Sequence, residues 1–123
     1  MKRMSYQQYK RISGKERSKY KNRKVEFNGI KFDSIKERDR YIYLLSRLKK
    51  GEITDLELQV PFELQPHFEH NGKMIRSINY IADFVYYDQE GNIHIEDTKG
   101  FRTDVYDLKK KMMLYRGFEI EEV

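Results

Sequence analysis

Residues 80–99 read YIADFVYYDQEGNIHIEDTK. The two halves of this stretch are rich in β-branched and aromatic residues, and QEGN at 89–92 supplies the glycine and polar residues of a turn. The pattern predicts two antiparallel strands, the first beginning near Met74 and the second covering 93–99. In a hairpin that turns at 89–92, Asp83 and Asp97 are expected to lie roughly opposite one another.

The acids and the lysine of this stretch suggest a site for a divalent metal ion. Asp97 and Lys99 are two residues apart on a strand, so their side chains project from the same face. Asp83 lies within an apolar run, where an ionised carboxylate must be paired or bind a metal, because burying it alone is costly. Hard cations such as Mg²⁺ or Mn²⁺ prefer carboxylate oxygens and activate water for phosphodiester hydrolysis. The alternative is a pair of ordinary strand-end charges, one of them paired with Lys99.

The acid-x-lysine pattern is weakly specific when it is taken alone. A second match, Asp107-Leu108-Lys109, falls within a predicted helix. Only Asp97-Thr98-Lys99 ends a strand that follows another strand with an inward-facing acid. The structural context therefore favours the first match as the catalytic one.

The flanking segments complete the order α, β, β, β, α, β. Asn28-Gly29, a dipeptide that readily forms a type I′ turn, indicates a small hairpin at 25–32. A helix is predicted at about 34–50 and a strand at 56–64. A second helix is predicted to begin at Thr103 or Asp104 and to end at Gly117, before a last strand at 118–123. The apolar positions at helical spacing are Tyr41, Leu44, Leu45 and Leu48 in the first helix and Val105, Leu108, Met112 and Tyr115 in the second.

Glu37, in the first turn of the first helix, has two interpretations. It shares a stripe with Tyr41 and Leu44, so its carboxylate is expected to point towards the sheet and to complete the metal site. Ser34-x-x-Glu37 is also a capping box, in which Glu37 accepts a hydrogen bond from the Ser34 amide for a purely structural purpose. The sequence leaves both interpretations open.

The positive charge of the chain is concentrated at its N-terminus. The net charge is +5 over 123 residues, but residues 1–24 carry ten basic side chains and one acid, a net of +9, and the rest carries −4. The chain therefore divides into a basic arm at 1–24, which favours a polyanion partner, and a single domain at 25–123. The alternative is a solvated tail that aids solubility. The predicted DNA-binding residues of the arm are Lys10, Arg11, Lys15, Arg17, Lys19, Lys21, Arg23 and Lys24.

Three further residues are candidates for contacts with DNA phosphates. Thr103, Lys109 and Lys110 lie in the first part of the second predicted helix, where hydroxyl and ammonium groups can hold phosphate oxygens. The alternative is a solvated helix face.

Composition excludes several classes of site. The chain has no cysteine, which rules out disulfides, thiolate zinc sites and cysteine nucleophiles. No apolar run approaches the roughly 20 residues of a membrane span, and the N-terminus is basic and polar. We therefore expect a soluble, cytoplasmic protein without a membrane partner.

Three motifs together resemble the PD-(D/E)XK nuclease superfamily: Ser34-x-x-Glu37 at a helix start, YIADF at 80–84 and IEDTKG at 95–100. The resemblance covers about residues 25–123. Within the superfamily, the sequence is similar in particular to small phage-encoded endonucleases, which are grouped with Holliday-junction resolvases and the Tn7-type transposon-end nuclease. It implies a restriction-endonuclease-like α+β fold, with a mixed central sheet flanked by helices. It also implies that Asp83, Asp97, Glu37 and the Thr98 carbonyl hold Mg²⁺, while Lys99 positions or deprotonates the attacking water. The superfamily's proline before the first acid is Ala82 here.

The sequence thus predicts a magnesium-dependent endonuclease that hydrolyses DNA, with phage recombination or replication as its setting and the host-cell cytoplasm as its location. A homodimer is a further hypothesis, because the resolvase-like relatives are dimeric. The rival hypothesis is a non-catalytic nucleic-acid-binding accessory protein, whose binding would ignore divalent metal. Which DNA structure is cut stays open.

Overall fold

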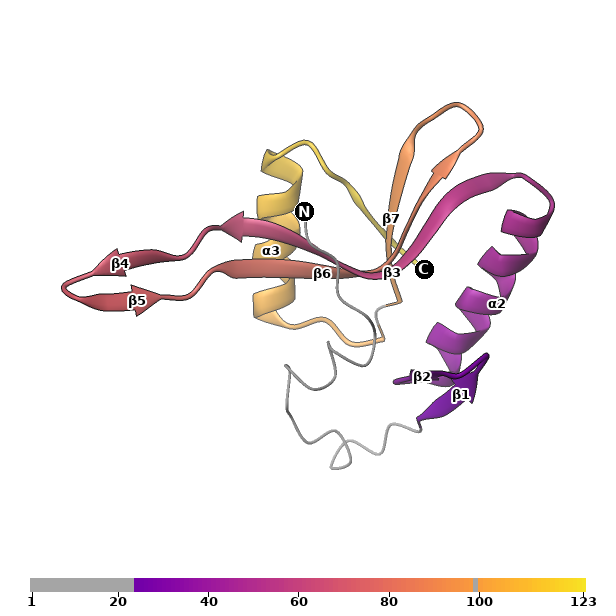
Figure 1. Cartoon of the computed structure of the whole chain (residues 1–123), viewed down its shortest axis with the longest axis horizontal. Coiled ribbons are helices and arrows are strands. Elements are labelled where there is room, and N and C mark those ends of the chain that lie inside the picture. Colours follow the sequence, from indigo (N-terminus) through magenta and orange to yellow (C-terminus); the bar gives the residue numbers. More distant parts are fainter. Residues whose placement is uncertain (1–23, 99) are drawn as a thin grey trace.

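A four-stranded mixed sheet with two helices forms the domain in the computed structural model, which describes residues 24–98 and 100–123 (Figure 1). The sheet order is β3-β6-β7-β8, with antiparallel pairing except between β7 and β8, which are parallel. The predicted α+β class and its αβββαβ order are confirmed. The elements are β1 (Val25–Phe27), β2 (Ile30–Phe32), α2 (Ile35–Lys49), β3 (Ile53–Gln65), β4 (Phe68–His70), β5 (Lys73–Ile75), β6 (Ile78–Asp88), β7 (Ile93–Asp97), α3 (Asp104–Tyr115) and β8 (Ile120–Glu122).

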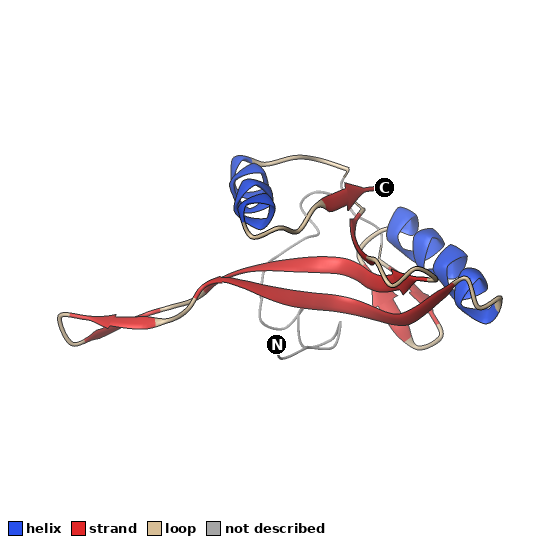
Figure 2. Cartoon of the chain, turned by 90° about the horizontal axis from the view of Figure 1, so that it is seen from above, coloured by secondary structure: helices blue, strands red, loops and turns tan. Residues whose placement is uncertain are grey.

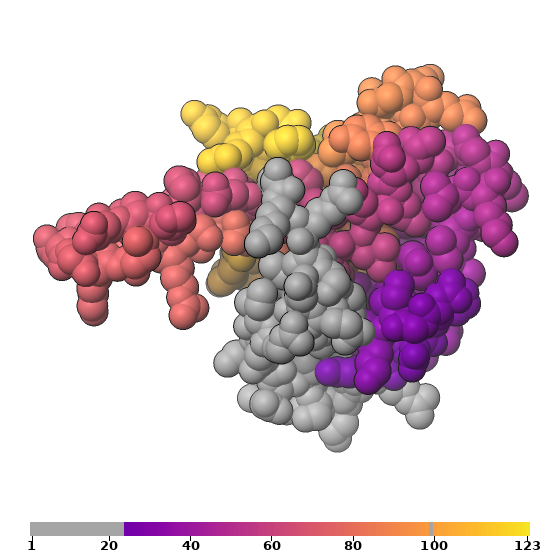
Figure 3. Space-filling model, viewed as in Figure 1, coloured from indigo at the N-terminus to yellow at the C-terminus, as the bar shows by residue number. Residues whose placement is uncertain are grey.

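One long hairpin spans residues 53–88 and extends beyond the body of the domain as a projecting arm (Figures 1 and 3). β3 pairs with β6 up to Gln65↔Ile78, and β4 pairs with β5 from Phe68↔Ile75 in the same register. Asn71 and Gly72 close the hairpin with φ values of 52° and 77°, as a type I′ turn requires. The prediction of one strand from Met74 onwards was wrong, because the chain leaves the ladder between β5 and β6. The short strand β4 was not predicted.

The domain has two apolar cores, one packed with α2 and one packed with α3. In both β3 and β6, the side chains of one face pass from one core to the other at a single point along the strand. Even-numbered residues of β3 pack with α2 before Gln59 and with α3 after it. Even-numbered residues of β6 change core at Asp83 in the same way, whereas Val85 stays with the α3-side core. Gln59 has a φ of 54°, a left-handed conformation that is uncommon outside glycine and that turns the strand. The α2 side holds Leu56, Leu58, Phe84 and Tyr86, and the α3 side holds Val60, Phe62, Leu64, Tyr80 and Ala82.

The two helices begin where the sequence predicts and pack against different parts of the sheet (Figure 2). The Ser34 hydroxyl caps α2 and the Thr103 hydroxyl caps α3, each by accepting a hydrogen bond from a backbone N–H of the first turn. Among the described helices, none is long and apolar enough to cross a membrane.

The buried faces of the helices differ in part from those expected. Helix α2 buries Tyr41 and Leu44, as predicted, but leaves Leu48 exposed near its end. Helix α3 buries Tyr106 and Met113, which each lie one residue later than the expected positions Val105 and Met112. One residue turns the buried face by about 100°, so three of the four apolar residues expected in the core point to solvent. These exposed residues are Val105, Leu108 and Tyr115.

A buried ion pair fastens α2 to the sheet. Glu96 on β7 is fully buried, and it accepts hydrogen bonds from Arg40 Nε at 2.8 Å and from Arg40 Nη2 at 2.6 Å. The Tyr86 hydroxyl donates a third hydrogen bond to Glu96. Neighbouring residues of a strand point to opposite faces, so this anchor lies on the other side of β7 from Asp97.

We expect Glu96→Gln to lower the free energy of unfolding by about 2–4 kcal/mol, because it leaves the partly buried Arg40 without its counter-ion. Urea denaturation monitored by circular dichroism measures the change. The control is Glu52→Gln, which removes the partner of Arg47 in an exposed pair and should change stability by less than about 0.5 kcal/mol. Equal effects of the two substitutions would contradict the anchoring role.

Candidate metal centre

The β6–β7 hairpin brings two of the predicted ligands together. Phe84 pairs with Glu96, and continuing this register by one residue places Asp83 opposite Asp97, as the sequence predicted. The Asp83 carboxylate is partly buried, and its Oδ2 accepts hydrogen bonds from the backbone N–H of Thr98 at 2.8 Å and from its hydroxyl at 2.9 Å. The end of β7 therefore holds Asp83 in place through Thr98.

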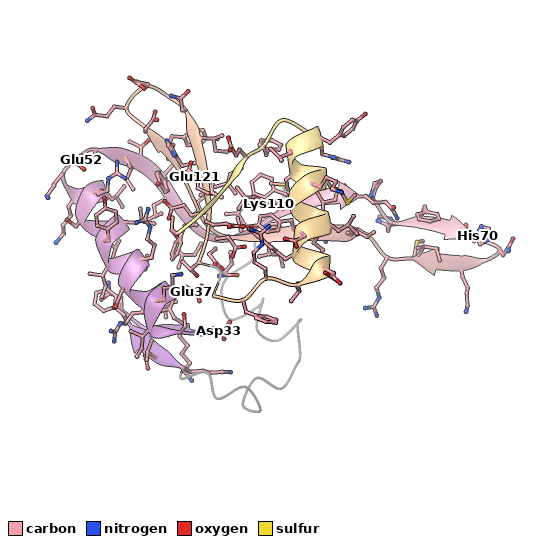
Figure 4. The ribbon with its side chains drawn as sticks, turned by 180° about the vertical axis from the view of Figure 1, so that it is seen from behind. Asp33, Glu37, Glu52, His70, Lys110 and Glu121 are labelled. Carbon is pink, nitrogen blue, oxygen red and sulfur yellow. The ribbon has the colours of Figure 1, made fainter. Side chains whose placement is uncertain are left out.

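Glu37 reaches the same region from α2. Its side chain lies on the side of the helix that faces the strands (Figure 4), and it is 4% exposed. Its Oε2 accepts a hydrogen bond from Gln59 Nε2 at 3.1 Å, and the same nitrogen donates to Asp83 Oδ1 at 3.3 Å. One amide group thus joins the first helix to the central hairpin.

The capping-box interpretation of Glu37 is borne out only in part. The Ser34 hydroxyl does accept a hydrogen bond from the Glu37 backbone N–H, at 3.1 Å. The reciprocal bond differs, because Glu37 Oε1 accepts from the backbone N–H of Asp33, at 3.3 Å, and not from that of Ser34. Glu37 Oε1 therefore binds the backbone at the helix start, whereas Oε2 binds Gln59, which also donates to Asp83.

Gln59 and Tyr80 are site residues that the sequence did not indicate. Gln59 is 2% exposed, although it follows Leu58 and precedes Val60 at a position that simple alternation assigns to the polar face. The Tyr80 hydroxyl donates a hydrogen bond to Asp97 Oδ2 at 2.7 Å. Burial and the nearby Asp97 charge raise the pKa of Tyr80, so its hydroxyl keeps the proton that it donates.

The carboxylates of this cluster disfavour one another's ionisation. Burial, followed by the charges of Asp83 and Asp33, raises the pKa of Glu37 to about 9. Burial and the charge of Asp97 raise the pKa of Asp83 to about 6, against the lowering effect of the Thr98 hydrogen bonds. A divalent cation offsets this kind of repulsion, and carboxylate oxygens are the donors that hard cations select.

The oxygen donors suit such a cation, but they are not yet gathered around one point. Within 24–98 and 100–123, no three His, Cys, Asp or Glu side chains form a ready metal-binding group. Instead, protein donors hold the carboxylates of Glu37, Asp83 and Asp97 through Gln59, Thr98 and Tyr80. Metal binding at this place requires these hydrogen bonds to rearrange.

The other predicted site residues have different positions. Lys99 lies outside the described residues, as do Lys10, Arg11, Lys15, Arg17, Lys19, Lys21 and Arg23. Lys24 is exposed beside β1. The Thr103 hydroxyl caps α3, and Lys110 donates to Glu122 Oε2 at 2.9 Å, so both already have protein partners. Lys109 is half-buried on α3.

We expect Glu37→Gln to change how stability depends on pH in the absence of metal. Because the folded-state pKa of Glu37 is raised to about 9, the folded chain keeps a proton that the unfolded chain releases near pH 4.5. The parent therefore loses stability as pH rises from about 4.5 towards 9. The glutamine side chain has no such proton, so the variant should lose less stability over this interval and melt higher than the parent at pH 8.

Thermal melting at several pH values, with EDTA present, tests this expectation. Ser34→Ala serves as the comparison, because it removes the helix cap at a cost of about 1 kcal/mol at every pH. A Glu37→Gln curve parallel to the parent's would mean that the carboxylate is not held against its neighbours' charges.

Most of the chain, including the residues of this site, matches a known family model. A family model described as "Protein of unknown function (DUF1064)" matches residues 17–122, a range that includes Glu37, Gln59, Asp83 and Asp97. No curated protein and no solved structure matches the chain. Because the family match covers most of the sequence, the chain belongs to the DUF1064 family.

Proposed function

We propose that this chain is a magnesium-dependent endonuclease that hydrolyses DNA phosphodiester bonds. The observation that carries the proposal is the meeting of Asp83, Asp97 and Glu37 from two strands and a helix, where burial and neighbouring carboxylates raise the pKa of Glu37 and of Asp83. Such an arrangement is costly for the fold and is typical of a cation site. The αβββαβ order supports placing the chain with the PD-(D/E)XK nucleases.

Each residue has a distinct role in this proposal. Asp83 and Asp97 hold the ion, with Glu37 and the Thr98 carbonyl completing the protein's share of its oxygen donors. When bound, Mg²⁺ polarises the phosphoryl oxygen and lowers the pKa of a water molecule. Lys99, two residues after Asp97, positions the attacking water or accepts its proton. Tyr80 orients Asp97 through the hydrogen bond to Oδ2.

The DNA would be held by charges outside the metal site. The basic arm at 1–24, with a net charge of +9, supplies cations for phosphate contacts, and Lys109 adds a further candidate on α3. Thr103 and Lys110 are further candidates, whose present protein partners would have to be exchanged for phosphate oxygens. We place the activity in phage DNA recombination or replication, in the host cytoplasm.

We expect Asp83→Asn and Lys99→Ala each to reduce DNA cleavage by at least about 100-fold, because one removes a ligand and the other a proton acceptor. Cleavage of labelled junction, flap, duplex and single-stranded substrates with Mg²⁺ or Mn²⁺ measures the loss. Asp107→Asn is the matched control, since it alters the acid of the second acid-x-lysine match on α3 and should leave cleavage unchanged.

Two results would argue against the nuclease. Full cleavage by Asp83→Asn would remove the proposed metal site. Tight DNA binding by the parent, with the same affinity in EDTA and no cleavage of any substrate, would favour the non-catalytic accessory protein.

A further inference from the structure

The side chain of Gln59 lies between two of the proposed metal ligands. It is 2% exposed, and its amide nitrogen donates to Glu37 Oε2 at 3.1 Å and to Asp83 Oδ1 at 3.3 Å. The backbone of Gln59 has a φ of 54°, which costs about 1 kcal/mol or more for a residue of this kind. A strained, buried polar residue at this point indicates a task beyond packing.

The oxygen of the same amide has no comparable use. Within the part of the chain that the structure describes, Oε1 of Gln59 accepts no hydrogen bond, although a buried carbonyl oxygen without a donor is unfavourable. A half-turn of the amide about its last torsion exchanges the positions of Oε1 and Nε2. The oxygen would then face two carboxylate oxygens, an arrangement that is stable only with a cation between them.

The distances suit a six-coordinate ion. Neighbouring ligands of octahedral Mg²⁺, each about 2.1 Å from the ion, lie about 3.0 Å apart. The present separations of 3.1 and 3.3 Å between the amide nitrogen and the two carboxylates are close to that edge length. Turning the amide would therefore bring its oxygen to about a ligand-to-ligand distance from both carboxylates.

We propose that Gln59 is a ligand of the metal centre, whose amide nitrogen bridges Glu37 and Asp83 without metal and whose amide oxygen turns to the ion when it binds. This inference rests on the proposed function, because it needs a cation at the same site. Gln59 would add a neutral side-chain oxygen to the three carboxylates and the Thr98 carbonyl. It also explains how the carboxylates are held together before the ion arrives.

Terbium luminescence gives a test that does not depend on cleavage. The chain has ten tyrosines and no tryptophan, and the Tyr80 hydroxyl contacts Asp97, so Tb³⁺ at the site should be excited through tyrosine. Competition with Mg²⁺ then gives the Mg²⁺ affinity of the full-length chain. Gln59→Gly removes the amide and accommodates the positive φ, and Gln59→Met repeats the test at similar volume if the glycine variant does not fold.

The direction of the change separates the two roles of the amide. If Oε1 is a ligand, Gln59→Gly should weaken Mg²⁺ binding at least about 10-fold, an expected loss of about 1.4 kcal/mol. If the amide is only a hydrogen-bond donor, its removal frees two carboxylate oxygens, and Mg²⁺ should bind as tightly or more tightly, which overturns the inference. Gln89→Ala, at an exposed amide that donates to the Gly51 carbonyl, is the control. A parent that binds neither ion overturns the proposed function as well.

A second inference comes from the exposed face of α3. Val105, Leu108 and Tyr115 recur at helical spacing and are 61%, 56% and 93% exposed, while Tyr106 and Met113 bury a different face in the core. Phe101, just before the helix, is 79% exposed. A helix with two apolar faces has one face for its own core and one for a partner.

The charges beside this stripe fit a second copy of the chain. Asp104 and Lys111 lie on the same flank of the stripe, and Leu108 lies at its middle. Two α3 helices that pack antiparallel about a two-fold axis at Leu108 bring Asp104 of one copy to Lys111 of the other, twice. The basic arm is a poor occupant of this face, because its net charge of +9 would meet Lys111 on the flank of the stripe.

We infer that α3 forms a two-fold, antiparallel contact between two copies of this chain. A contact of one short helix with its copy is small, so the dimer is expected to be weak and to depend on concentration in the micromolar range. This inference stands on the exposed stripe and does not require nuclease activity.

Analytical ultracentrifugation of the full-length chain over a concentration series tests the dimer. Leu108→Glu, which places like charges on the two-fold axis, should abolish association, whereas Leu114→Glu on another side of the helix should not. Asp104→Lys and Lys111→Asp should each weaken the dimer, and the double variant should restore it. A parent that stays monomeric, as it would if another segment of the same chain covered the stripe, overturns the inference, as does a double variant without recovery.

Discussion

At Gln59 and Asp83 the even-numbered side chains of β3 and β6 change from one apolar core to the other. A regular hairpin would present Asp83 to one core only, among apolar side chains that offer no hydrogen bonds. The left-handed residue in β3 breaks that regularity, and the even-numbered side chains of both strands change core there. Asp83 consequently lies at the boundary of the two cores, where Gln59 of β3 and Thr98 at the end of β7 both donate hydrogen bonds to it. The polar cluster exists because the apolar packing is interrupted there.

Two contacts keep this boundary in register. The Arg40–Glu96 pair fixes α2 against β7 on one side of the sheet, and Glu37, one helical turn before Arg40, is thereby directed towards the cluster. Thr98 continues β7 past Asp97 and donates to Asp83 through both its backbone and its side chain. Glu96 and Asp97 are adjacent in sequence but lie on opposite faces of one strand, so the anchor uses one residue and the proposed metal site uses the other.

Local signals allowed much of the fold to be predicted, and long-range packing explains what was missed. The Asn-Gly turn at 28–29, the caps at Ser34 and Thr103 and the pairing of Asp83 with Asp97 each depend on residues close in sequence. Gln59 could not be found, because a left-handed residue within a strand leaves no mark on the alternation of its neighbours. The buried face of α3 was misplaced by one residue because two apolar stripes run along that helix. For the projecting β4–β5 hairpin, Asn71-Gly72 indicated a turn, but the flanking strands are too short to show an alternation of apolar and polar residues.

The continuous hairpin at 53–88 has a consequence for how the chain folds. Pairing that begins at the Asn71-Gly72 turn can proceed outwards one pair at a time, and each step closes only a small additional loop. Gln59 and Asp83 meet in this way although they are 24 residues apart. Arg40 and Glu96 are 56 residues apart, so α2 must dock across a much longer loop after the strands have paired. Substitutions near the hairpin turn should therefore act mainly on the rate of folding, and those at the Arg40–Glu96 anchor mainly on the rate of unfolding.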